Sequence, residues 1–256
     1  MKLTILGSGT VVPSKDAGSA GYLLDVDGKK ILFDTGLGTL HKLDKLGIDG
    51  REIHHIFYSH LHNDHICELP PLLWYMFVAN KLEPEAKLTK DMGLTIYGPE
   101  GTKDYVDLIW HKVLGKEDAC PFIKEVIELG SSSVEIDDLV IKTEPVVHMA
   151  PTIAFRVEHD GKSLVYSGDL ERCEGIEKLA KGTDLLLLEC AFPKDRVEEM
   201  HMNTAQGGKL ANESAVKKLV LTHRYPPTLK IDAAAEAAEH FDGNIIVAED
   251  LMEIEI

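Results

Sequence analysis

The segment His60–His65 carries three imidazoles and one carboxylate, at His60, His62, Asp64 and His65. Imidazole nitrogens and carboxylate oxygens together suit zinc, manganese or iron, and the absence of nearby paired thiolates argues against a purely structural zinc site. Histidines on a solvated loop are the plain alternative, but ordinary packing and solvation do not require such a density of ligands. The segment therefore predicts a metal site, which makes the chain a candidate metal-dependent hydrolase.

The apolar residues just before this segment predict the element that positions it. Ile53 and Ile56–Tyr58 are typical of a buried strand, so the ligands would lie where that strand ends and a loop begins. Loops at strand ends are where catalytic groups are commonly held.

A hydrolytic metal site needs more ligands than one loop supplies, and isolated His and Asp residues follow three later apolar segments. They are His148 after Leu139–Val147, Asp169 after Leu164–Gly168, and His223 after Leu219–Thr222. Taken singly, each would more often be a structural histidine or a turn aspartate. Together with the first cluster they predict one composite metal site.

Composition narrows the class of protein. A chain of 256 residues with 44% hydrophobic and 27% charged residues, undivided by any linker, predicts one globular domain over residues 1–256. The formal net charge of −16 disfavours general nucleic-acid binding, although bound divalent metals would reverse the sign locally. Four scattered cysteines indicate free thiols in a reducing compartment, and the longest apolar run, Leu69–Ala79, is too short to span a bilayer. We therefore expect a cytoplasmic protein without a membrane segment.

This constellation resembles the metallo-β-lactamase superfamily over nearly the whole chain. Its further marks are Leu6–Gly9 after the first predicted strand, Phe33–Gly36 after an early strand, and Ser167–Asp169. The resemblance implies the α/β class and a four-layer αβ/βα sandwich, with two mixed sheets face to face, helices outside and the site at one edge. Helix-like stretches near residues 101–113, 204–210 and 232–240, set among short apolar strands, agree with that fold.

The same resemblance assigns the ligands. One metal ion would be held by His60, His62 and His148, a second by Asp64, His65 and His223, and Asp169 would bridge the two. Two divalent metal ions per chain are therefore implied, with zinc as the first choice and manganese or iron as alternatives that share these ligands. Two such cations can share a hydroxide and polarise the bond under attack. Asp34 would either accept a hydrogen bond from a ligand imidazole or serve as a simple turn residue.

Within the superfamily, the motifs resemble the ribonuclease Z-like branch and its related phosphodiesterases. Leu6–Pro13 and Phe33–Thr39 look like the glycine-containing segments of that branch, and Ile96–Gly101 looks like its Gly-Pro element. The glutamate that the branch carries at the position of Leu37 is missing.

His201 lies where this branch carries a catalytic histidine that is not a metal ligand. An alkoxide leaving group needs a proton, and an imidazole can donate one near neutral pH. His201 and the ligand Asp64 are therefore our predicted catalytic residues. The alternative for His201 is a plain helix start, capped by Asn203 or Thr204.

The substrate expected from the sequence is small. About twenty residues separate His148 from Asp169, which leaves no room there for the long arm with which ribonuclease Z holds transfer RNA. With a charge of −16 as well, a small phosphodiester such as a cyclic nucleotide is favoured over RNA 3′ processing as the substrate.

Two rival functions remain at the sequence level. A thioesterase or lactonase would use the apolar run Leu69–Val78 for an acyl chain, but a thiolate leaving group scarcely needs His201. A metal-stabilised scaffold is disfavoured because all seven ligands are present. The stretch Leu69–Glu85 is expected to cover the site, line an apolar pocket or form a homodimer interface.

Overall fold

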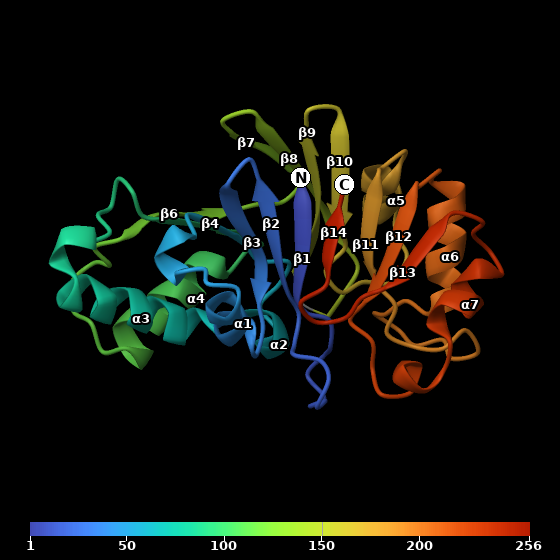
Figure 1. Ribbon diagram of the computed structural model, residues 1–256, viewed down its shortest axis with the longest axis horizontal. Helices are drawn as coiled ribbons and strands as arrows, with labels where there is room; N and C mark the ends of the chain where they lie inside the picture. Colours follow the sequence, from blue (N-terminus) through green and yellow to red (C-terminus); the bar gives the residue numbers. More distant parts are fainter. Residues whose placement is uncertain (150) are drawn as a thin grey trace.

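Two seven-stranded mixed sheets lie face to face in the computed structural model, which describes residues 1–149 and 151–256 (Figure 1). The first sheet contains β1 (Lys2–Gly7), β2 (Gly21–Val26), β3 (Lys29–Thr35), β4 (His55–Phe57), β5 (Leu94–Gly98), β6 (Ile123–Glu128) and β14 (Glu253–Glu255). The second contains β7 (Ser132–Ile136), β8 (Leu139–Val146), β9 (Thr152–His159), β10 (Lys162–Tyr166), β11 (Leu185–Glu189), β12 (Lys218–Thr222) and β13 (Asn244–Val247). The spatial orders are β14-β1-β2-β3-β4-β5-β6 and β13-β12-β11-β10-β9-β8-β7.

The two sheets repeat one pattern of strand directions. Counted from β14 in the first sheet and from β7 in the second, three neighbouring pairs are antiparallel and the next three are parallel. In the second sheet β8, β10, β11 and β12 therefore run in one direction, and the residues that follow them emerge at the same edge. This edge is where three of the predicted ligands lie.

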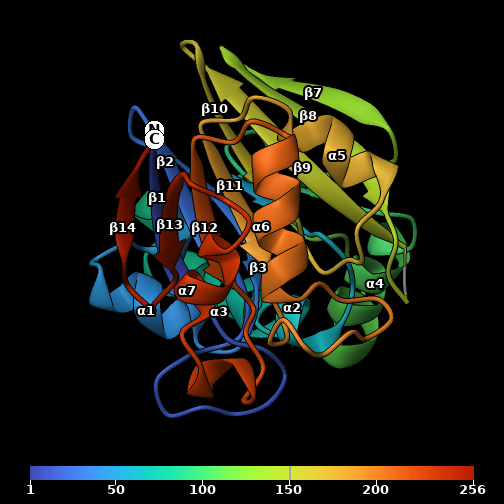
Figure 2. The same ribbon diagram turned by 90° about the vertical axis from the view of Figure 1, so that its right-hand side faces the viewer.

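Helices cover the outer faces of both sheets. They are α1 (Thr39–Lys45), α2 (Asn63–Ile66), α3 (Leu69–Leu82), α4 (Thr102–Leu108) with a π-helical turn at Ile109–Val113, α5 (Glu174–Ala180), α6 (Thr204–Glu213) and α7 (Ala233–Ala238). Short 3-10 turns occur at Gly50–Glu52, Pro84–Ala86 and Thr228–Lys230. The helices α1, α3 and α4 pack on the first sheet, and α5, α6 and α7 pack on the second (Figures 1 and 2). The predicted α/β class and four-layer sandwich are confirmed, as are the predicted helices near 101–113, 204–210 and 232–240.

The layer between the sheets is apolar and rich in aromatic rings. Phe33 and Phe57 of the first sheet lie 5.3 and 5.7 Å, centroid to centroid, from Phe155 of the second. All three are buried, and such ring pairs add to the free energy gained from burying their area. This packing fixes the distance between the two sheets and therefore between the ligands that each contributes.

One of the three predicted roles for the apolar stretch after the metal loop, covering the site, was wrong. The run forms α3, and one face of that helix packs on the first sheet instead of covering the ligands. The buried positions are Leu69, Leu72, Leu73, Met76 and Ala79, spaced three or four apart. A cavity of about 660 Å³ beside α1 is lined partly by Pro71 and Tyr75 but by none of the predicted ligands. The run is chiefly core because its apolar spacing matches the helical period.

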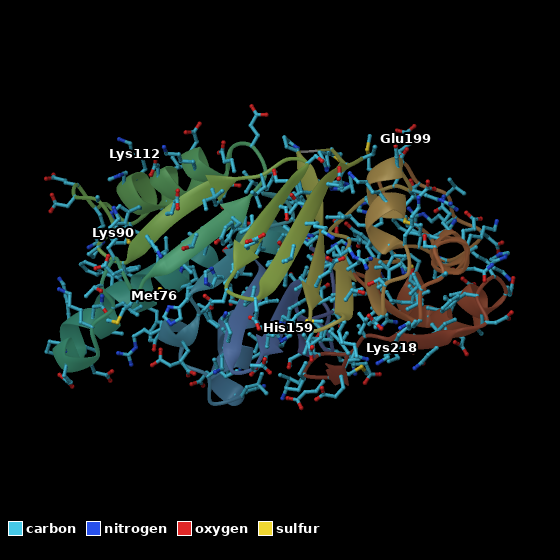
Figure 3. The ribbon with its side chains drawn as sticks, turned by 90° about the horizontal axis from the view of Figure 1, so that it is seen from above. Met76, Lys90, Lys112, His159, Glu199 and Lys218 are labelled. Carbon is cyan, nitrogen blue, oxygen red and sulfur yellow. The ribbon has the colours of Figure 1, made fainter. Side chains whose placement is uncertain are left out.

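The edge opposite the ligands carries the strand turns and is charged. Seen from above in Figure 3, it includes His159 at the end of β9, whose ring nitrogens lie 3.1 and 3.4 Å from Asp27 and Asp138.

All four cysteines are unpaired, as expected for free thiols. Among the described residues, no helix has the length and apolar character needed to cross a membrane.

Gly168, between β10 and Asp169, allows a close approach of the two sheets. Its φ is +60°, and a Cβ at this position would lie 2.7 Å from Ser59 Cβ. Gly28 has φ +86° but no atom within 4 Å of a built Cβ.

Gly168→Ala should therefore lower the free energy of unfolding by about 3 kcal/mol. Left-handed backbone costs a non-glycine residue roughly 1–2 kcal/mol, and overpacking adds about 1–3 kcal/mol. Gly28→Ala is the matched control, since it carries only the backbone cost. Chemical denaturation of both variants measures the difference, and equal losses would contradict the close approach.

Candidate metal centre

The ligand-rich loop starts where β4 ends and runs into the short helix α2. Within it His60, Asp64 and His65 are buried, whereas His62 is only partly buried. The loop is fixed to the second sheet by a backbone hydrogen bond, because Ile153 N donates to Ser59 O at 2.9 Å. Strand β4 thus positions the first four predicted ligands, as the sequence indicated.

The second sheet contributes the other three predicted ligands from the ends of β8, β10 and β12. Asp169 Oδ1 lies 3.3 Å from both His65 Nε2 and His223 Nδ1, and its Oδ2 lies 4.0 Å from His148 Nε2. His223 Nε2 lies 3.3 Å from Asp64 Oδ2. Asp169 therefore stands between the two predicted groups, in the position that a bridging carboxylate would occupy.

Two trios of side chains match the predicted ligand sets. In each, one ligand atom per residue lies within 4.8 Å of the others, and the trios are His60, His62, His148 and Asp64, His65, His223. A third trio, His60, His65 and Asp169, spans both sets. All seven predicted ligands thus converge on one place between the sheets.

Hydrogen bonds determine which ring nitrogen of His60 and of His65 is available to bind a metal ion. Ser59 Oγ donates to Asp34 Oδ2 at 2.8 Å, so it can only accept from His60 Nδ1, 3.0 Å away. His65 Nδ1 likewise donates to Asp34 Oδ2, at 2.7 Å. In both rings the proton on Nδ1 leaves Nε2 for a metal ion.

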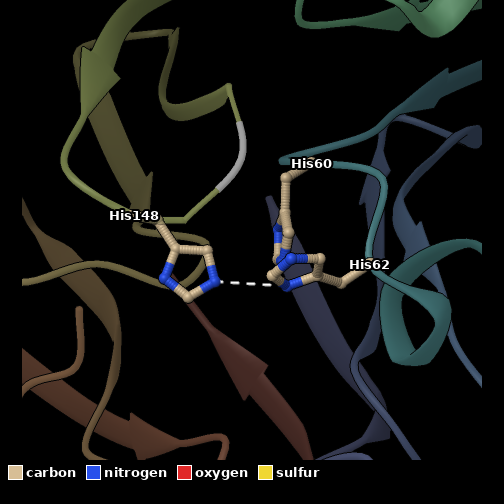
Figure 4. Close-up of side chains that lie close together, drawn as sticks. All are labelled: His60, His62 and His148. Atoms are coloured by element: carbon tan, nitrogen blue, oxygen red, sulfur yellow. Dashed lines mark hydrogen bonds between the residues drawn. The ribbon is translucent and has the colours of Figure 1, made fainter. Parts of the chain in front are cut away.

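His148 is oriented in the same way from the second sheet. Its Nδ1 donates to the carbonyl oxygen of Met200 at 2.9 Å, and its Nε2 points at His62 Nδ1, 3.2 Å away (Figure 4). The His60 and His62 rings lie 4.5 Å apart, centroid to centroid, and the His60 and His148 rings 5.0 Å. The three rings of the first trio therefore lie close together, in edge-to-face pairs.

Four buried atoms of the site have no hydrogen-bond partner among the described residues: His60 Nε2, His65 Nε2, Asp169 Oδ1 and His223 Nδ1. A buried polar atom without a partner costs about 1–3 kcal/mol, so several at one place call for a ligand. Neutral nitrogen and carboxylate oxygen are donors that zinc, manganese and iron accept. The residues present therefore fit divalent metal ions.

Asp34 accepts a hydrogen bond from the imidazole of His65, a predicted ligand, and is not merely a turn residue. Besides His65 and the Ser59 hydroxyl, its carboxylate accepts from Ser59 N at 2.7 Å and from the Tyr166 hydroxyl at 2.5 Å. Asp34 is fully buried and has a left-handed φ of +57°. Backbone in this region is uncommon for a non-glycine residue and is often found at functional sites.

His201 lies at the same site but outside the two trios. Its ring centroid is 5.2 Å from that of His148 and 6.2 Å from that of His223. Asn203 caps the following helix, in a capping box with Gln206, so the predicted cap at Asn203 is confirmed as well. His201 therefore lies both just before a capped helix and beside the predicted ligands.

Glu189, which is fully buried at the end of β11, was not among the residues predicted for the site. His201 Nδ1 donates to Glu189 Oε2 at 3.0 Å, and Leu170 N donates to Glu189 Oε1 at 2.5 Å. Glu189 also forms a possible ligand group with Asp169, His201 and His223. A carboxylate that closes the wholly apolar run Leu185–Leu188 was the available signal.

Burial and charge shift the titration of the site. Burial lowers the pKa of His60 well below its ordinary value. Burial would also lower the pKa of His223, but the charge of Asp169, the hydrogen bond to Asp64 and the nearby Glu189 carboxylate outweigh it and raise the pKa to about 10. Burial would raise the pKa of Asp64, yet its hydrogen bond with His223 and the His65 charge hold it below the ordinary value. Asp64 is thus ionised at neutral pH.

Comparison with known proteins agrees with this geometry. Residues 29–224 match the family described as Beta-lactamase superfamily domain. The chain is 31% identical over 286 aligned positions to a protein named Ribonuclease Z from Mycolicibacterium gilvum, covering 100% of this chain and 96% of that protein. The metallo-beta-lactamase fold protein YhfI from Bacillus subtilis is similar with a TM-score of 0.86 at 22% identity, covering 100% and 99% of the two chains. A diphosphatase from the PhnP family is similar with a TM-score of 0.76 at 20% identity, covering 100% and 97%.

Metal binding should release protons. The pKa of His223 is raised from 6.5 to about 10, so its charged form stabilises the metal-free fold fully below pH 6.5, and this stabilisation is lost as the pH rises through about 10. A metal ligand must be a neutral imidazole, so loading with zinc near pH 7 should displace about one proton or more per chain. Titration calorimetry in two buffers of different ionisation enthalpy measures this. The same heat in both buffers would contradict the raised pKa.

Proposed function

The chain belongs to the beta-lactamase superfamily and is a metal-dependent hydrolase related to ribonuclease Z, and from this premise we propose that it is a dinuclear phosphodiesterase for small phosphodiesters. The observation that carries the proposal is that both ligand trios lie beside the Asp169 carboxylate, whose Oδ1 is 3.3 Å from His65 Nε2 and whose Oδ2 is 4.0 Å from His148 Nε2. His60, His62 and His148 would hold one ion, Asp64, His65 and His223 the other, and Asp169 both. Zinc is the first choice of metal, with manganese or iron as alternatives. The proposal treats residues 1–256 as one domain.

Two residues of this chain would move protons in the reaction. When bound, the metal ions activate water and polarise the phosphoryl group. Asp64 is ionised and hydrogen-bonded to His223, so it can accept a proton from the attacking water. His201 would donate a proton to the leaving oxygen. Glu189 holds His201 through Nδ1, which leaves Nε2 for that transfer.

A small substrate is favoured over a polymer. The residues between His148 and Asp169 are taken up by β9, β10 and the turn at Asp160–Gly161, and no arm projects there among the described residues. The alignment with the Mycolicibacterium gilvum protein is longer than this chain, so that protein carries segments that this chain lacks. Polyanion binding depends on Lys and Arg contacts, and the chain has 27 such residues against 43 Asp and Glu.

RNA 3′ processing is the second candidate function, because the relative named Ribonuclease Z matches the full chain. An acyl hydrolase is less favoured than at the sequence level, since the apolar run meant for an acyl chain is mostly core. Homodimerisation remains a proposal that rests on the exposed Trp74, Tyr75 and Leu82 of α3.

Activity and metal content should be measured on one preparation. We expect about two metal ions per chain, turnover of bis(p-nitrophenyl) phosphate, and little turnover of a p-nitrophenyl acyl ester. Ester turnover alone would move the assignment to an acyl hydrolase. Efficient trimming of a structured RNA at moderate salt, with small phosphodiesters untouched, would favour the ribonuclease.

His201→Ala and Asp169→Ala should separate proton transfer from metal binding. His201→Ala should lower turnover about 10²–10⁴-fold, the usual contribution of a general acid, while the metal content stays at that of the unmodified protein. Asp169→Ala should lower the content of both metal ions. Exposed His54, which precedes β4 at the end away from the ligand loop, supplies the control variant His54→Ala. Equal metal loss in the His201 and Asp169 variants would refute the division of roles.

A further inference from the structure

We infer that Tyr166 is a positioning residue of the metal centre, which holds His65 in its ligating orientation through a hydrogen bond to Asp34. The inference rests on the proposed dinuclear site. It concerns a residue that lies outside both ligand trios and outside the His201–Glu189 pair. Its basis is the geometry of the hydrogen bonds around one buried carboxylate.

The hydrogen bond from Tyr166 joins the two sheets next to the predicted ligand His65. Tyr166 ends β10 in the second sheet, and its hydroxyl donates to Oδ2 of Asp34, near the end of β3 in the first. The same Oδ2 accepts from His65 Nδ1 at 2.7 Å. Tyr166 is therefore one hydrogen-bond step from a predicted ligand, although it comes from the opposite sheet.

The other three hydrogen bonds to Asp34 come from a different part of the chain. Both groups of Ser59 and the His65 ring belong to the segment from the end of β4 to α2, which follows a strand of the first sheet. Tyr166 instead stands three residues before Asp169, joined to it by the tight turn at Gly168. It thus relates the carboxylate that orients His65 to the segment that carries the predicted bridge.

Packing makes the Tyr166 hydroxyl a fixed donor. The ring is 3% exposed and lies 4.8 Å from the Tyr22 ring and 6.1 Å from the Phe33 ring, centroid to centroid. A ring held on several sides cannot turn its hydroxyl elsewhere without disturbing the core. Removing that oxygen would leave the Asp34 carboxylate with its other donors but without its hydrogen bond to β10.

The chain offers a matched control in Tyr58. This residue is equally buried, and its hydroxyl pairs with Thr35 Oγ1 at 2.8 Å. Its neighbours in sequence include Ser59, and Thr35 follows Asp34, so Tyr58→Phe removes a buried hydroxyl from the same region without touching the Asp34 carboxylate.

The test is metal affinity, measured by titrating zinc or cobalt(II) against a chromophoric chelator. In Tyr166→Phe we expect the second ion, the one assigned to His65, to bind about tenfold more weakly, since loss of a partner behind a ligand usually costs 10–100-fold. The first ion should bind as in the unmodified protein, and Tyr58→Phe should leave both affinities unchanged. Thermal unfolding of the two variants shows whether each is folded. Unchanged affinity in Tyr166→Phe, or equal weakening in both variants, would overturn the inference.

A double-mutant cycle tests whether Tyr166 acts through Asp34. The effect of Tyr166→Phe on the second ion should shrink markedly in an Asp34→Asn background, because the carboxylate that transmits it is gone. Additive effects would overturn the inference while leaving the dinuclear site intact. Failure of the unmodified protein to bind a second ion would overturn the dinuclear proposal, and the positioning role with it.

Discussion

The geometry of the metal centre depends on one buried carboxylate, that of Asp34, and on the four hydrogen bonds it accepts. A carboxylate at a fully buried position is stable only when donors replace the water it has lost. The donors come from the loop after β4 and from β10, so the requirement to satisfy one side chain ties three segments together. The ligands from each sheet are therefore placed relative to each other by a contact that binds no metal.

This arrangement is supported by strain at the site and by packing away from it. Among the described residues, eight that are not glycine have positive φ, and three of these, Asp34, Met200 and His223, belong to the predicted centre or contact one of its predicted ligands. Such backbone costs on the order of 1–3 kcal/mol per residue and persists only where the surroundings fix it. The aromatic layer between the sheets and the helices outside supply that rigidity. The start of α2 adds little rigidity to the ligand loop, because this helix is a single turn without a side-chain cap.

The sequence predicted well the features that follow from local pattern. His148, Asp169 and His223 were found because each follows an apolar strand, and strand ends of one direction meet at one edge. The prediction that Leu69–Glu85 covers the site was wrong because it rested on the number of apolar residues and left out their spacing. Its buried residues recur at helical intervals, which would have indicated a helix packed on a sheet.

Glu189 and Tyr166 were missed for a different reason. Their roles arise from contacts between residues distant in the chain, 12 positions apart for Glu189 and His201 and 132 for Tyr166 and Asp34. A tyrosine or glutamate at the end of an apolar strand is common in proteins, and only the folded chain brings its partner to it. The predicted ligands could be picked out in the sequence, whereas the groups that hydrogen-bond to them could be identified only in the fold.

The charge of the chain bears on the proposed choice between a small phosphodiester and RNA, which the metal ligands alone do not decide. At physiological ionic strength a surface charge is felt over about 8 Å, so a small phosphodiester entering the site responds mainly to the local charge of the centre. A long polyanion would lie over the surrounding surface as well, and with 43 acidic residues against 27 basic ones that surface repels it on average. This difference between local and overall charge supports the proposal that the substrate is a small phosphodiester and not RNA.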